Sequence, residues 1–130
     1  MSDLRGKTGD SAKEKNVLPK TFRDFVRMHS RIWEAHEMLT KACAEAGPLD
    51  RKTRELIKVG MSVGAGLETA AKRHAIMALE NGAAVEEIYQ TVLLAMTTCG
   101  HPRAVAGWQW VHQALTSGRS PRTKKKTRKA

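Results

Sequence analysis

Residues 55–74 read ELIKVGMSVGAGLETAAKRH and place an acidic residue, Glu55, and an imidazole, His74, on two successive helical patterns. The two patterns are joined through Gly64-Ala65-Gly66, which favours a turn. If the segments pack as a helical hairpin, both side chains can meet in one apolar pocket, where a small helical protein can build a proton-transfer site. The stretch contains no cysteine, so thiol chemistry is hard to place in it.

Helical periodicity continues upstream of this stretch. Apolar residues between positions 22 and 42 recur three or four apart, which predicts one or two amphipathic helices that end at Gly47-Pro48. Asp50 is a candidate N-cap for the next helix, the one that carries Glu55. We expect Gly64 and Gly66 to break that helix.

The downstream sequence predicts three more helical segments. One runs from about Glu68, carries small residues on one face and ends at Asn81-Gly82. The next has Glu86-Glu87 in its first turn and ends at Gly100, and Pro102 suits the first turn of the last helix. No segment alternates as a strand does, so we predict an all-α domain of five or six helices with mostly antiparallel neighbours.

The net charge of +10 belongs mainly to one end of the chain. Residues 119–130 carry +7, whereas residues 1–20 carry +2 and residues 21–118 carry +1. Blocks of like charge without apolar side chains repel themselves and stay solvated. We therefore expect a flexible arm over residues 1–17, one helical domain over residues 18–118 and a basic disordered tail after it.

Hydropathy and cysteine content narrow the class of protein further. No apolar run approaches about 18 residues and the start of the chain is polar, so we expect neither a membrane span nor a secretory signal. The two cysteines, Cys43 and Cys99, form no Cys-x-x-Cys pair and predict no disulfide framework. A cytoplasmic protein without membrane contact is the expectation.

Glu55 and His74 are the candidate chemical centre. The small apolar neighbours of His74 on its helix face direct the imidazole toward the packed side, and Glu55 borders the apolar stripe of its own helix. A carboxylate placed there can fix the tautomer of a buried imidazole and form a general acid/base couple with it. In the structural alternative, Glu55 pairs with Arg51 or Lys58 and His74 is a core histidine bonded to a carbonyl.

Four short motifs follow one another along the chain: LDRKTRELI at 49–57, HAIMALENGA at 74–83, EEI at 86–88 and CGHP at 99–102. In order and spacing they resemble the carboxymuconolactone decarboxylase family, which includes the alkylhydroperoxidase D-like proteins. The resemblance covers about residues 48–115. It implies an all-helical, alkylhydroperoxidase D-like fold that assembles as a homotrimer or homohexamer, with the active pocket near a subunit interface.

In the alkylhydroperoxidase branch of this family, a Glu, a Cys-x-x-Cys pair and a His form a proton-relay and redox site. The resemblance places Glu55 and His74 at the Glu and His positions, and Leu67 and Ala70 at the cysteine positions. Peroxide reduction of that kind needs a thiolate and a resolving thiol, so the chain resembles a member that lacks the redox half of the site. Cys99 lies on another segment and is at most a lone thiol.

The decarboxylase branch uses no metal or organic cofactor, and its substrate is a small lactone carboxylate. Loss of carbon dioxide leaves a dienolate-like charge, so the protein must stabilise an anion and deliver a proton to carbon. The resemblance implies that His74 donates the proton and that Glu55 orients it. The chain departs from this branch at Thr69-Ala70, where a Glu-Leu pair is usual, and at His101, where an aliphatic residue is common, which leaves the substrate open.

His101 and Trp108 are candidates for substrate binding. His101 can contact a substrate carboxylate or lie exposed in a loop, and Trp108 can line a pocket for a cyclic substrate or fill a core or subunit interface. The remaining histidines show no spacing typical of a metal site, so we expect no metal.

The sequence thus favours a cofactor-free, carboxymuconolactone decarboxylase-like lyase, or a related acid/base enzyme, acting on a small carboxylated or lactone metabolite. One alternative is an alkylhydroperoxidase or peroxiredoxin-like antioxidant protein with a divergent or lost thiol site. Another is a non-catalytic oligomeric scaffold whose Lys/Arg-rich tail binds nucleic acid by neutralising phosphates. That tail can equally be a solubilising extension.

Overall fold

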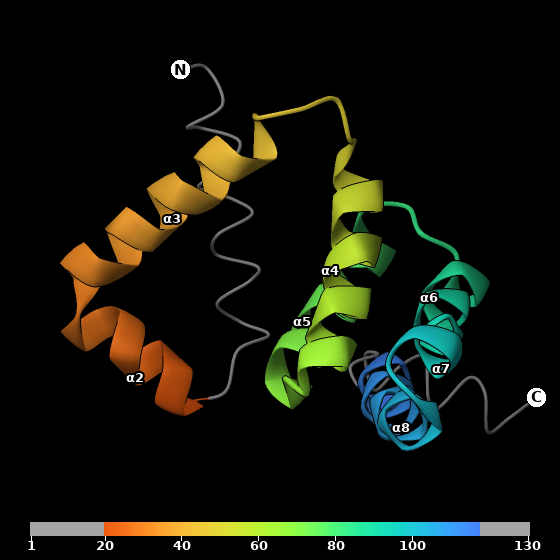
Figure 1. The fold of residues 1–130 in the computed structure, drawn as a ribbon. Coiled ribbons are helices and arrows are strands. Elements are labelled where there is room, and N and C mark those ends of the chain that lie inside the picture. The colour runs from red at the N-terminus through yellow and green to blue at the C-terminus, as the bar shows by residue number, and fades with distance from the viewer. Residues whose placement is uncertain (1–19, 118–130) are drawn as a thin grey trace, which may run out of the picture. The chain divides into compact units, whose positions relative to one another are not determined.

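The computed structural model describes residues 20–117 of the 130, and this span is helical with no strand in it. It contains six helices of nine or more residues and one four-residue helical turn, so the prediction of an all-α fold is confirmed. The predicted N-terminal arm and basic tail lie outside the described residues. The elements are α2 (Lys20–Met28), α3 (Ser30–Ala44), α4 (Arg51–Ala65), α5 (Glu68–Glu80), α6 (Val85–Leu93), α7 (Ala95–Thr98) and α8 (His101–Ser117) (Figure 1).

The chain divides into two compact units between Leu49 and Asp50. In the first unit, α2 and α3 are separate helices because His29 leaves helical geometry, with φ −127° and ψ 55°. The indole of Trp33 is buried and packs edge-on against Phe22, with ring centroids 5.5 Å apart. This aromatic contact and the buried Val26 form the small core between the two helices.

The second unit begins with a hairpin of α4 and α5. As predicted, Asp50 caps α4, and its Oδ1 accepts a hydrogen bond of 2.8 Å from the backbone N–H of Thr53. The prediction that Gly64 breaks α4 is wrong, because the helix continues to Ala65 and only Gly66, at φ 76°, takes the left-handed conformation that ends it. Gly64 instead allows close packing, since a Cβ there would lie 3.1 Å from Sγ of Cys99.

Helix α5 packs closely against α4 and α8 because three alanines on one face, Ala71, Ala75 and Ala78, are completely buried. Beta-branched and leucine side chains from the neighbouring helices fill the space around them. The largest fully buried members of this core are Ile88, Leu115, Val59, Val63, Val92 and Val111.

The segment predicted as one helix from about Glu86 to Gly100 divides at Leu94 into α6 and the short α7. Its start is as predicted, and Glu87 accepts a 2.8 Å hydrogen bond from the backbone N–H of Ala84. Gly100, at φ 102°, separates α7 from α8, whose first turn contains Pro102 as expected. Within the described span, no helix is both long and apolar enough to traverse a bilayer.

Candidate functional site

Helices α4 and α5 bring Glu55 and His74 together. Nδ1 of His74 lies 2.7 Å from Oε1 of Glu55, although the residues are 19 positions apart in sequence. The pair is buried, with 4% of the Glu55 side chain and 11% of the His74 side chain exposed. Of the two side chains, His74 therefore has the larger fraction of its surface exposed to solvent.

The local sequence explains this geometry. Glu55 is one turn before the buried Val59, so it faces α5, and His74 lies on the face of α5 that carries the buried alanines. The left-handed Gly66 then reverses the chain so that the two faces meet. One part of the structural alternative also holds, because Nε of Arg51 lies 3.3 Å from Oε2 of Glu55. The partner of the imidazole is the carboxylate and not a backbone carbonyl.

The surroundings of Glu55 favour its ionised form. Burial alone raises the pKa of its carboxyl group, but the hydrogen bond and charge of His74, with the charges of Lys58 and Arg51, outweigh burial and hold the pKa below its usual value. An ionised carboxylate only accepts hydrogen bonds, so Nδ1 of His74 carries the hydrogen and donates it. Nε2 is then the ring atom left for proton exchange with another molecule.

The lowered pKa of Glu55 predicts a specific acid sensitivity. Since the folded-state pKa lies below the ordinary 4.5, the stabilisation from this carboxylate is present above that pH and is lost as the pH falls through the folded-state value. Glu55→Gln should cost about 2 kcal/mol of unfolding free energy at pH 7, and the difference from wild type should shrink below pH 4.5. Urea unfolding at several pH values measures this difference.

The control for this experiment is Glu80→Gln, which changes an exposed carboxylate at the end of α5. It should stay within about 0.5 kcal/mol of wild type at every pH. A Glu55→Gln deficit that is as large at pH 3 as at pH 7 would show that the carboxylate contributes no pH-dependent stability.

The other predicted site residues lie apart from this contact. His101 is exposed at the first position of α8, and Trp108 is 37% exposed on the same helix. At the positions that the resemblance matches to the redox cysteines, Leu67 is exposed at the N-cap of α5 and Ala70 is half-buried in its first turn. The free cysteines Cys43 and Cys99 are both exposed.

Trp108 belongs to an aromatic cluster that sequence reasoning missed. Its ring stacks on His112 at 4.6 Å and on Tyr89 at 5.6 Å, and the hydroxyl of Tyr89 lies 2.7 Å from Nδ1 of His112. Tyr89 comes from α6, whereas Trp108 and His112 come one turn apart from α8. That spacing of four along α8 was the available signal, but nothing in the sequence linked it to Tyr89.

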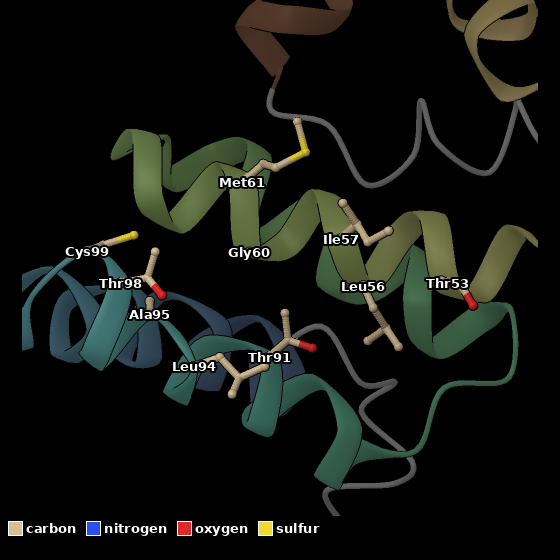
Figure 2. A pocket seen from close by; sticks show the side chains of 10 residues that line it. All are labelled: Thr53, Leu56, Ile57, Gly60, Met61, Thr91, Leu94, Ala95, Thr98 and Cys99. Carbon is tan, nitrogen blue, oxygen red and sulfur yellow. The ribbon is translucent and has the colours of Figure 1, made fainter. Parts of the chain in front are cut away.

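A second missed feature is a groove of about 350 Å³ between α4 and the α6–α7 segment. Figure 2 shows its lining side chains, and Cys99 lies at one end of it. Glu55 does not line the groove, because Gly60, which does, is about 140° away around α4. All of the lining residues are uncharged: Thr53, Leu56, Ile57, Gly60, Met61, Thr91, Leu94, Ala95, Thr98 and Cys99.

Residues 20–117 contain no cluster of side chains suited to a metal ion. No three His, Cys, Asp or Glu side chains of that span are grouped as the ligands of an ion would be.

Comparisons with known proteins agree with this architecture. A model of the carboxymuconolactone decarboxylase family matches residues 24–113. Besides the region of the four motifs, this span includes α3 and most of α2. Among solved structures, the chain is similar to the apo crystal structure of a carboxymuconolactone decarboxylase family protein from Legionella pneumophila, with a TM-score of 0.64 and 20% identity. That similarity covers 79% of this chain and 95% of the Legionella chain, and it concerns the fold. No curated protein sequence matches the chain.

Proposed function

The chain belongs to the carboxymuconolactone decarboxylase family, and on this premise we propose that it is a cofactor-free decarboxylase or a related acid/base enzyme acting on a small carboxylated or lactone metabolite. The observation that carries the proposal is the buried 2.7 Å contact between Glu55 and His74. It supplies an ionised carboxylate, an oriented imidazole and one ring nitrogen that remains free to exchange a proton.

The proposed reaction divides the work between the two residues. As the bond between the substrate carbon and its carboxylate breaks, carbon dioxide leaves and the electron pair enters the conjugated system as a dienolate. Protonated His74 passes the proton on Nε2 to carbon, becomes neutral and recovers a proton from water. Glu55 stays ionised throughout, holds Nδ1–H and stabilises the imidazolium, which is the role of an orienting carboxylate in other imidazole-based sites.

Turnover of a substrate panel tests this proposal. The purified full chain, dialysed against EDTA, should release carbon dioxide from γ-carboxymuconolactone or from another lactone carboxylate in the panel without any added cofactor. Substrate contacts at His101 and Trp108, assembly as a homotrimer or homohexamer, and nucleic-acid binding by the tail remain predictions. Activity that depends on an added metal or organic cofactor would contradict the proposal.

The thiol alternative has a separate test. Cys99 lines the groove, which Glu55 does not, and Cys43 belongs to the other compact unit, so Cys43→Ser and Cys99→Ser should each keep decarboxylation within about twofold of wild type. In parallel, thiol-dependent reduction of hydrogen peroxide is measured on the same three proteins. Peroxide reduction that disappears with Cys99→Ser would favour the antioxidant function instead.

A further inference from the structure

Each oxygen of the Glu55 carboxylate has its own partner. Oε1 faces Nδ1 of His74 on α5 at 2.7 Å, and Oε2 faces Nε of Arg51, one turn earlier on α4, at 3.3 Å. The carboxylate is thus held from two directions, one partner on each helix of the hairpin. A terminal carboxylate torsion has a broad, roughly two-fold preference, so a single hydrogen bond leaves it free to rock, whereas two bonds fix its plane.

The Arg51–Glu55 pair differs from the other ion pair of this spacing on the hairpin. Lys72 and Glu68 on α5 lie 2.9 Å apart, with 34% and 51% of their side chains exposed, and such solvated pairs contribute little. Arg51 is similarly exposed, at 30%, but its partner Glu55 is only 4% exposed. Water therefore has little access to Oε2, and the guanidinium group supplies the hydrogen bond that water would otherwise make.

Lys58 provides a contrast within the same helix. It lies one turn after Glu55 and helps to hold the pKa of that carboxyl below its usual value through its charge. The contact that fixes Oε2 in place comes from Arg51. Both cations place charge near the carboxylate, whereas Arg51 also makes a hydrogen bond to it.

We propose that Arg51 is a positioning residue of the acid/base site, which holds Oε2 of Glu55 so that Oε1 stays on Nδ1 of His74 and Nε2 remains the reacting atom. Its effect on turnover rests on the proposed function, whereas its effect on the imidazole tautomer does not. Removing Arg51 frees the carboxylate to turn, so neutral His74 loses the constraint that keeps its hydrogen on Nδ1.

The test is long-range ¹H–¹⁵N NMR of the His74 ring in the ¹⁵N-labelled full chain, recorded at rising pH until the ring nitrogens give the shift pattern of a neutral imidazole. Wild type should show the pattern of a single Nδ1–H tautomer. Arg51→Met, and independently Arg51→Ala, should lose that pure pattern, and Arg51→Lys should keep more of it. For the substrate that the panel identifies, the kcat of Arg51→Met should fall on the order of tenfold, as for other partners that orient a reacting group.

Two controls separate positioning from charge and from helix stability. Lys58→Met removes a cation near Glu55 but not the contact to Oε2, and Lys72→Met removes an exposed helical ion pair. Both should keep the Nδ1–H pattern. The proposal is overturned if Arg51→Met keeps the pattern, or if Lys58→Met disturbs it equally. A tautomer that changes with no loss of turnover would leave the positioning role intact and count against the proposed function.

Discussion

His74→Asn is expected to lower kcat/KM for the substrate that wild type decarboxylates by about 10²-fold to 10⁴-fold, the usual contribution of a general acid. The amide nitrogen of asparagine stands close to where Nδ1 of histidine lies, so it can donate to Oε1 of Glu55 and preserve the buried contact. What the variant lacks is Nε2, the atom that exchanges the proton in the proposed reaction. Steady-state kinetics with the substrate identified from the panel measure the loss.

Two further variants make this result specific. His74→Ala should lose turnover to the same extent and also lose stability, because it leaves the Glu55 carboxylate buried without the imidazole. His36→Asn changes an exposed imidazole of α3, in the other compact unit, and should keep full turnover. Full activity in His74→Asn, with the helix content of wild type, would remove His74 from the chemistry.

Gly107→Ala should reduce the unfolding free energy by about 2 kcal/mol, the usual cost of overpacking a core. Gly107 is buried in α8, and a methyl group there would overlap the side chain of Val63 on α4, lying only 2.8 Å from its Cγ2. Val63 is completely buried and beta-branched, so it has little freedom to turn aside. Urea denaturation of the two proteins measures the difference.

Gly60→Ala should instead increase the unfolding free energy. A methyl group there would make an ordinary 3.4 Å contact with Cγ2 of Thr91, and alanine is favoured over glycine inside a helix by about 0.8 to 1 kcal/mol.

The double variant Gly107→Ala/Val63→Ala should be at least about 0.5 kcal/mol more stable than the sum of the single effects predicts. Additive effects, or a stabilising Gly107→Ala, would contradict this packing of α4 against α8.

Local signals in the sequence predicted the helices well. Asp50 before α4, Glu68 in the first turn of α5 and Gly82, at φ 97°, after its end all occupy the positions that capping chemistry predicts. The periodic apolar residues also placed Glu55 and His74 on faces that meet. These features depend on neighbours within one helical turn, so the sequence carries them directly.

Features that depend on packing between distant segments were not predictable in the same way. Gly64 looks like a helix breaker in the sequence, yet it is a helical residue that makes room for Cys99. The groove between α4 and the α6–α7 segment is lined in part by Leu94, where the predicted helix divides although the sequence has no glycine or proline there. Long-range contacts decide both cases.

The partner of Glu55 illustrates the same limit. The sequence left His74 and Arg51 as competing partners, because spacing alone treats the contacts as alternatives. The structure has both, one on each carboxylate oxygen. A carboxylate has two oxygens, and in a helical hairpin each oxygen can accept a hydrogen bond from a different helix.

The most direct test of proton transfer by His74 is a crystal structure of the full chain with a saturated lactone carboxylate that cannot lose carbon dioxide. We expect the ring carbon that accepts the proton, at the end of the dienolate system, to lie within about 3.5 Å of Nε2 of His74, as a near-attack geometry requires, with Glu55 still on Nδ1. A ligand seated in the groove at Leu56 and Thr91 with His74 out of reach would contradict the account.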